Sequence, residues 1–113
     1  MDRQDFFDQI VTNHKIGFDL IKSKNTDYAA TQDPFKNFRA AEMFGMTVEQ
    51  GILLRMSDKM SRIANLLESE PKVKEESIED ALLDLMNYTN ILLTYRQDKR
   101  SNSITQSVDD LKK

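Results

Sequence analysis

Three aspartates in this sequence have spacings that suit a shared site. Asp80 and Asp84 are four residues apart, and Asp58 comes earlier in the chain. Residues four apart share one face of an α-helix, one turn from each other. If the helices that carry Asp58 and Asp80 pack antiparallel, the three carboxylates converge, and Glu76 adds a fourth. Such oxygen clusters suit Mg²⁺ or Mn²⁺, hard cations that keep bound water and bridge phosphates.

Basic side chains accompany the first of these acids. Arg55, Lys59 and Arg62 fall on the flank of the same predicted helix as Asp58. Guanidinium and ammonium groups hold phosphate oxygens through charge-assisted hydrogen bonds. Acids and bases together indicate a site for a phosphorylated small molecule, most simply a nucleotide.

Each of these patterns also has a purely structural interpretation. Asp80 stands three residues after Ser77, which has the form of a helix-capping signal. Asp58 and Arg62 have the spacing of an ordinary ion pair within one helix. The only histidine, His14, falls on the apolar stripe of the first predicted helix, where a core or border position is commoner than catalysis. The pattern leaves both interpretations open.

The elements that must position these residues are helices. Apolar residues recur every three or four positions, which is the helical period. This spacing predicts a helix over residues 5–23, a short one over 34–44, and long ones over 47–68 and 76–96. With only 3 Gly and 2 Pro, and no alternation of apolar and polar residues, nothing indicates a sheet. We predict an all-α helical bundle whose two long helices run antiparallel and pack with the first.

Local signals mark several helix ends. Asp33 followed by Pro34 is a start signal, and Gly45 is a stop signal. Thr47 and Gln50 have the form of a capping box at the start of the first long helix. Residues 69–75 read as a linker, residues 1–97 as a single domain, and residues 98–113 as a polar tail or a short docked helix.

Composition excludes several functional classes. The chain has 113 residues, a formal net charge of −3 and no cysteine, so disulfides and thiolate chemistry are excluded. Positive and negative residues are interspersed, whereas nucleic-acid binders carry a basic stripe, so no nucleic-acid partner is expected. No apolar stretch approaches the roughly 20 residues of a membrane span. The acidic N-terminus is not a signal peptide. We expect a cytoplasmic protein.

The long helices carry apolar residues on two faces. In the second, Leu83 and Ile91 stand among Asp80, Asp84 and Asn87, away from the main apolar stripe. A solvated helix face normally carries few large apolar groups. We therefore expect a homo-oligomer, a dimer or larger, in which this mixed face with Leu83 and Ile91 sits at the contact between subunits.

Four segments of the sequence resemble a known family. They are residues 24–28, 33–39, 58–66 and 76–88. In this order they resemble the nucleotide modification associated domain, first type, which is found in phages and bacteria. That family is similar to the MazG-like all-α NTP pyrophosphatases, which include dimeric dUTPases. The resemblance covers about residues 18–95.

The resemblance implies Mg²⁺ held by acidic motifs on two consecutive helices. By position, Asp58 and Asp80 match the acids of the two motifs, and Glu76 stands one turn before the second. The enzymes have an E-E-x-x-E pattern in the first motif, where this chain has Lys59 and Arg62, so fewer metal ligands remain. The implied catalytic residues are Asp58 and Asp80. The implied metal ligands are Asp58, Glu76, Asp80 and Asp84, and the substrate-binding residues are Lys24, Tyr28, Asn37, Arg55, Lys59, Arg62 and Asn87.

Three functions are therefore considered. The first is an Mg²⁺-dependent nucleoside triphosphate pyrophosphohydrolase that acts on a (deoxy)nucleotide. The second is a nucleotide-binding or sequestering module without turnover, in which basic side chains replace the metal as phosphate partners. The third is a helical assembly protein whose Asp- and Asn-bearing faces are buried between subunits.

Overall fold

The protein is all-α, as predicted. The computed structural model describes residues 1–27, 33–68 and 71–112, with side chains for all of these except residues 26, 27 and 71–76. Within these ranges no strand occurs. The elements are α1 (Arg3–Asp27), α2 (Lys36–Arg39), a 3₁₀ helix η1 (Ala40–Phe44), α3 (Val48–Leu67) and α4 (Pro71–Leu111). No described helix combines the length and apolar character needed to cross a membrane.

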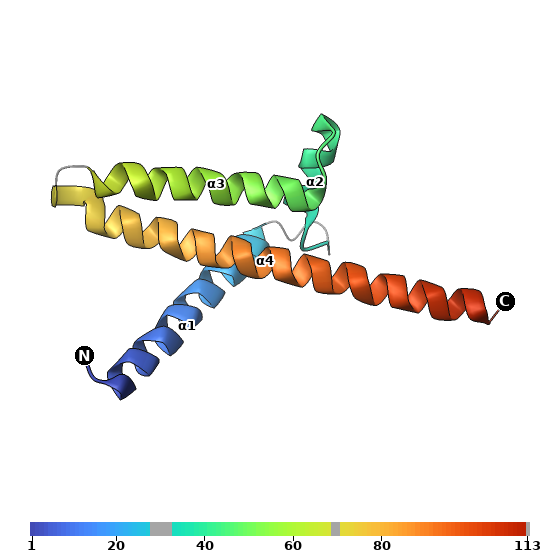
Figure 1. The fold of residues 1–113 in the computed structure, drawn as a ribbon, viewed down its shortest axis with the longest axis horizontal. Coiled ribbons are helices and arrows are strands. Elements are labelled where there is room, and N and C mark those ends of the chain that lie inside the picture. Colours follow the sequence, from blue (N-terminus) through green and yellow to red (C-terminus); the bar gives the residue numbers. More distant parts are fainter. Residues whose placement is uncertain (28–32, 69–70, 113) are drawn as a thin grey trace.

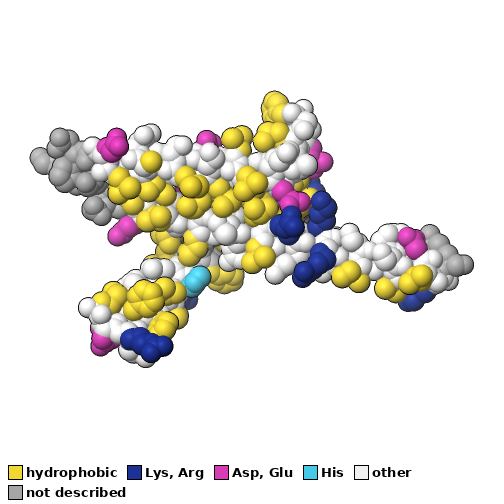
Figure 2. All heavy atoms as spheres, in the orientation of Figure 1, with side chains coloured by type: hydrophobic (Ala, Val, Ile, Leu, Met, Phe, Trp, Pro, Cys, Tyr) yellow, Lys and Arg dark blue, Asp and Glu magenta, His cyan; other side chains and the backbone are white. Residues whose placement is uncertain are grey.

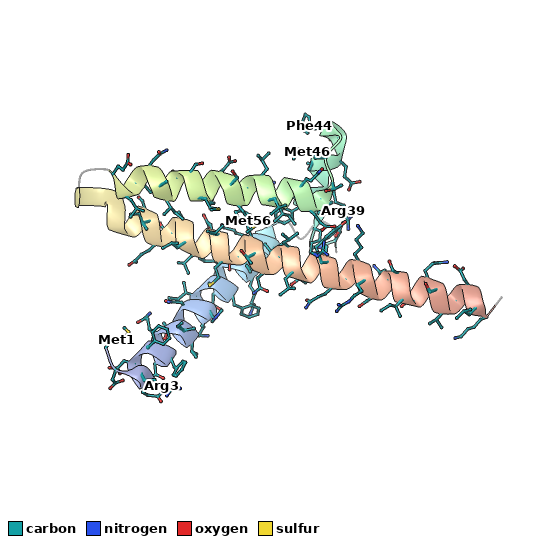
Figure 3. The ribbon with its side chains drawn as sticks, viewed as in Figure 1. Met1, Arg3, Arg39, Phe44, Met46 and Met56 are labelled. Carbon is teal, nitrogen blue, oxygen red and sulfur yellow. The ribbon has the colours of Figure 1, made fainter. Side chains whose placement is uncertain are left out.

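The centre of the fold is an antiparallel hairpin of α3 and α4 (Figure 1). Ion pairs fix its register: Lys59 contacts Asp84 near the middle, and Glu49 contacts Arg96 towards the start of α3. The C-terminal half of α1 crosses α4, and α2 with η1 packs at the start of α3. Half-buried Met56 lies between the two long helices (Figure 3).

The predicted end signals of α3 and η1 are confirmed. The Thr47 hydroxyl accepts the Gln50 N–H, and the Gln50 side chain accepts the Thr47 N–H, which makes the capping box. Gly45 ends η1 with a left-handed φ of 75°, a backbone conformation that glycine adopts without steric cost. At Asp33 the outcome differs. Its carboxylate accepts the Phe35 N–H, so Phe35 occupies the N-cap position and α2 begins two residues later than predicted.

The two outer helices are longer than predicted. The Asp2 carboxylate accepts the Asp5 N–H, so α1 begins at Arg3 rather than Asp5. Helix α4 runs without interruption from Pro71 to Leu111, so residues 71–75 of the predicted linker and residues 98–111 of the predicted tail are helical and continuous with the second long helix. No Gly or Pro follows Pro71, and pairs such as Gln106 with Asp110 stabilise the exposed end, which projects past the other helices (Figure 1).

The buried core is small. Its apolar members among the described residues are Phe35, Val48, Ile52, Ile78 and Ala81. Leu53, Met60 and Leu67 follow the same helical spacing on α3 as Ile52, but they are 51%, 59% and 62% exposed. His14, predicted at the core or its border, is exposed as well. Large areas of apolar surface on α1, α3 and α4 are therefore uncovered in a single chain (Figure 2).

Gly17 lets α1 approach α4 closely. A Cβ atom at this position would lie 2.6 Å from Met86 Cε and 2.9 Å from Asn87 Oδ1. Both distances are shorter than van der Waals contact, so a larger residue would force the helices apart or displace both side chains. The absence of a side chain at Gly17 therefore sets the distance between α1 and α4 where they cross, next to the cavity described below.

Candidate functional site

A cavity of about 560 Å³ lies where α1, the α2 segment and α4 meet. Its wall combines aromatic rings, amides and a few charges. Arg55 of α3 closes one side. The aromatic residues are Phe18, Phe35, Phe38 and Tyr88; the amides are Asn25, Asn37, Asn87 and Asn90; the charged residues are Lys24, Arg55 and Asp84.

Arg55 holds the α2 segment against α3. Its guanidinium lies 4.7 Å from the centre of the Phe38 ring, a cation–π contact, and donates a hydrogen bond of 3.4 Å to the Asn37 carbonyl. Phe38 and Tyr88 contact each other edge to face: their ring centres are 6.3 Å apart and their ring planes are nearly perpendicular. The aromatic wall therefore joins three elements: α2, α3 and α4.

Among the described residues of the cavity wall Asp84 is the one acid, and two lysines neutralise it. Lys59 Nζ lies 2.9 Å from one carboxylate oxygen, and Lys24 Nζ lies 3.4 Å from the other. Partial burial alone would raise the pKa of Asp84. The hydrogen bond from Lys59 and the charge of Lys24 outweigh it, so the pKa is lower than usual. The Asp84 carboxylate is therefore ionised and already paired.

The structure brings together part of the predicted substrate-binding set. Lys24, Asn37, Arg55 and Asn87 line the cavity, and Lys59 reaches its edge through Asp84. Arg62 lies elsewhere, in a groove along α3 that also contains Asp58, Ser61, Asn65 and Leu66. Tyr28 lies outside the described residues.

The predicted metal ligands are not brought together. No group of three or more His, Asp or Glu side chains that could hold a metal ion occurs in the described part of the chain. Asp58 lines the α3 groove, Asp80 is exposed on α4, and Asp84 is paired with lysines. The Glu76 side chain lies outside the described set. The described acids thus do not fit Mg²⁺, and the magnesium site stays a prediction.

Sequence reasoning missed several cavity residues. Phe18 stands four residues after His14, on the apolar stripe of the first helix, a spacing that predicts a core position, but it is 59% exposed at the cavity. Asn90 stands three residues after Asn87 on the same helix, a spacing that puts both amides on one face. Asn25 falls inside the motif at 24–28 and could have been found from it.

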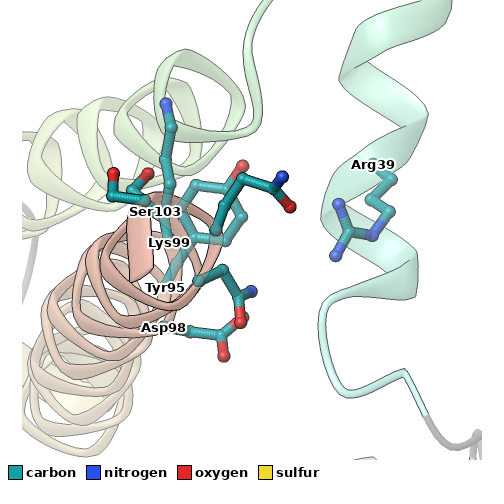
Figure 4. Close-up of a pocket in the computed structure, with 8 residues that line it drawn as sticks. Arg39, Tyr95, Asp98, Lys99 and Ser103 are labelled. Carbon is teal, nitrogen blue, oxygen red and sulfur yellow. The ribbon is translucent and has the colours of Figure 1, made fainter. Parts of the chain in front are cut away.

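A second hollow, of about 530 Å³, opens between α2 and the projecting part of α4. Figure 4 shows Arg39 facing Tyr95, Asp98, Lys99 and Ser103 across it. Arg39 is already engaged, because its Nε donates a 2.6 Å hydrogen bond to Asp33. This hollow is lined by one aromatic ring and mostly polar, exposed side chains, so it offers a ligand less apolar contact than the 560 Å³ cavity does.

The Asp33–Arg39 pair gives a pH prediction for the α2 segment. The hydrogen bond from Arg39, with the Phe35 N–H second, lowers the pKa of Asp33. A lowered carboxyl pKa stabilises the fold above the unfolded value of about 4, and this stabilisation is lost as pH falls through the folded pKa. The pair is partly exposed, so we expect less than about 1 kcal/mol.

Urea unfolding of wild type and Asp33→Asn between pH 6 and pH 2.5 measures this contribution. The wild type should lose more stability than the variant on acidification, although Glu49 and Asp84, whose pKa values are also lowered, contribute to both curves. Arg39→Gln is the matched control and should remove the same increment. Parallel curves for wild type and Asp33→Asn would contradict the prediction.

Comparisons with known proteins do not assign the chain to a class, so its class is described by its fold and its site. No protein-family model matches the chain, and no curated protein or solved structure is significantly similar to it. The fold and the site define an all-α protein with an antiparallel hairpin and an aromatic- and amide-lined cavity beside it.

Proposed function

We propose that the cavity between α1, α2 and α4 binds a nucleotide. The observation that carries the proposal is its lining by described residues: four aromatic rings, four amides, two cationic side chains and the paired acid Asp84 around about 560 Å³. Small-molecule sites have volumes of roughly 300–1,000 Å³, with apolar walls and a few polar groups that orient the ligand. Rings and amides suit a base and a sugar, and cations suit a phosphate.

Lys24 and Arg55 are the phosphate partners in this proposal. Both line the cavity and both are exposed, so a phosphate at its mouth keeps partial contact with water. The negative charge of Asp84 does not exclude a phosphate, because Lys24 and Lys59 compensate it. The cation–π contact of the Arg55 guanidinium, 4.7 Å from the centre of the Phe38 ring, holds this side chain in place before a ligand binds.

Binding without turnover is the primary proposal, and pyrophosphohydrolysis is the second. The position of Asp84 in the cavity wall favours the second, as does the resemblance to MazG-like enzymes. Against it, the described acids are separated and Asp84 is paired with two ammonium groups. This chain's own residues can bind and orient a nucleotide; hydrolysis would additionally need the predicted metal.

A panel of nucleoside mono-, di- and triphosphates tests both proposals. With Mg²⁺ present, we expect a rise in melting temperature with at least one nucleotide. Lys24→Gln should weaken its affinity about tenfold or more, since a charge-assisted hydrogen bond contributes about 1.5–3 kcal/mol. Lys15→Gln, an exposed change on the same helix outside the cavity, is the matched control.

Pyrophosphate release in the same samples separates the two nucleotide functions. A thermal shift without release supports binding alone, and a shift with release supports the enzyme. Absence of any shift across the panel would contradict both and would favour the assembly protein.

We also propose that a second copy of this chain covers the apolar side of the α3–α4 hairpin, making a homo-oligomer of MazG-like type. Leu53, Met60, Leu67, Leu82 and Leu93 each follow directly after a residue that is less exposed than itself. Successive residues of a helix are rotated by about 100°. In two antiparallel helices that face each other, the residues that directly follow inward-facing ones therefore point to the same side of the pair. The five side chains therefore lie on one side of the hairpin, and Figure 2 shows hydrophobic side chains gathered along α3 and α4.

The cavity lies on the opposite side of the same hairpin. Arg55 and Asp84 line the cavity, and each comes directly before a half-buried residue of its helix, Met56 or Leu85, so they turn the other way. A second copy on the apolar face thus leaves the cavity open. A self-complementary patch of this kind suits the isologous contact of a two-fold dimer.

A further inference from the structure

Helix α1 is almost uncovered in a single chain. Among its described residues only Gly17 and Ile21 are not exposed, and Gly17 lies against Met86 and Asn87 of α4. Residues 3–16, which form the α1 arm, extend past the edge of α4 (Figure 1), and every one of them is exposed. The helix is therefore held at one end and free along more than half of its length.

The arm continues the helix face that packs on α4. Steps of four and three residues lead back from Ile21 through Gly17 to His14, Ile10 and Phe7. Steps that average 3.5 residues keep side chains on one face of a helix. The contact face thus runs on into solvent along the arm. The large apolar side chains on this face and at its borders are Phe6, Phe7, Ile10 and Val11.

The arm cannot fold back onto its own hairpin. Helix α1 is continuous from Arg3 to Asp27, and sharp bends in helices occur mainly at Pro or Gly. Gly17 is the only such residue in α1, and it is held against α4. A bend there would disrupt the contact that places the helix. Because contiguous exposed apolar surface marks an interaction site, another chain must cover the arm.

The apolar side of the α3–α4 hairpin is too small by itself for a stable dimer. Its five apolar side chains and the four of the arm are each between 39% and 68% exposed. A large apolar side chain has a surface on the order of 200 Å², so the hairpin offers roughly 500 Å², and hairpin and arm together offer roughly 900 Å². A standard interface buries about 800 Å² per partner. A second copy therefore has to engage both surfaces.

The arm and the hairpin match in length and in the direction they face. At 1.5 Å per residue, the row from Leu53 to Leu67 and the arm are each about 20 Å long. Figure 2 shows hydrophobic side chains on the outer part of α1 and on the hairpin from the same side. A two-fold axis that runs between them would place each arm on the hairpin of the other copy. Such a contact is isologous and closes a dimer.

We propose that two copies of this chain exchange their α1 arms, so that each arm lies along the apolar side of the other copy's α3–α4 hairpin. The inference rests on the homo-oligomer proposed above and names the element of the second copy that covers the hairpin. An amphipathic helix in an apolar groove is a common mode of recognition. Here Leu53 and Met60 of α3 and Leu82 and Leu93 of α4 border the groove.

Phe7→Glu combined with Ile10→Glu tests the role of the arm by light scattering. The wild type should have the mass of a dimer and the variant half of it, because the new charges would be buried without partners. Thr12→Glu combined with Ile16→Glu is the matched control. Both positions are exposed, and Ile16 follows Phe7 by nine residues, which places it about half a turn round the helix. The control should remain a dimer.

The masses separate this inference from the assembly on which it rests. A dimeric Phe7→Glu/Ile10→Glu variant would overturn the exchange of arms and leave the homo-oligomer standing. A monomeric wild type would overturn both. Neither result bears on nucleotide binding, which is measured separately.

Cysteine cross-linking identifies what the arm contacts, since the chain has no cysteine of its own. Tagged Ile10→Cys and untagged Met60→Cys chains are refolded together and treated with a bismaleimide, whose spacer tolerates an offset of about one helical turn. We expect links between tagged and untagged chains. Links only between two Ile10→Cys chains would show paired arms, and links only between two Met60→Cys chains would show paired hairpins. Either result, or no link at all, would overturn the inference.

Discussion

Replacing Ile52 with alanine is expected to lower the free energy of unfolding by about 2–5 kcal/mol, the range for large-to-small changes in a core. Ile52 is the one large side chain that is fully buried among the described residues, and its helix α3 packs on α4 and on the α2 segment. Removing its methyl groups leaves a cavity that two rigid helices cannot readily close. Since domains are stable by roughly 5–15 kcal/mol, the loss is a large fraction of the total.

Urea unfolding followed by circular dichroism measures this loss, and the adjacent Leu53→Ala is the control. Leu53 is 51% exposed in a single chain, so its truncation should cost much less in dilute protein. If a second copy covers Leu53, the cost of Leu53→Ala grows with protein concentration, whereas that of Ile52→Ala changes little. Equal losses in the free energy of unfolding for the two variants in dilute solution would contradict the packing described here, in which Ile52 is buried and Leu53 is exposed.

Features that depend on local physics were predictable from the sequence. The capping box at Thr47 and Gln50 needs only residues three apart, and it forms as expected. Gly45 ends η1 because a left-handed residue is needed there. The two long antiparallel helices follow from the helical period. Local hydrogen bonds and periodicity decide such features, so no distant contact can easily overrule them.

Features that depend on contacts between distant residues were not predictable. A wide apolar stripe on α3 does not show which half is buried: in the folded chain Ile52 is fully buried, whereas Leu53 is 51% exposed. The polar side of the hairpin was recognised, but Asp84 is paired by Lys24, a residue 60 positions away. The burial of Asn87 likewise depends on Gly17, which the sequence marks only as a weak point in a helix.

Charged substitutions on the apolar side of the hairpin are expected to have the other large effect, which is on the oligomeric state. In light scattering after gel filtration, the wild type should have the mass of a dimer or larger, and Leu53→Glu combined with Met60→Glu should have the mass of a monomer. Both side chains are more than half exposed in one chain, so the glutamates are well solvated once subunits separate. In the assembly they would be buried without partners, which costs several kcal/mol per charge.

Leu54→Glu is the matched control for the assembly. Leu54 neighbours Leu53 and is 53% exposed, nearly the same as Leu53 at 51%, but it points about 100° further round the helix. It should therefore leave the mass unchanged. Because the cavity faces the other side, the dissociated double variant should still bind the nucleotide that wild type binds. A wild type that is monomeric at micromolar concentration would refute the assembly, and loss of mass in Leu54→Glu alone would place the contact on a different face.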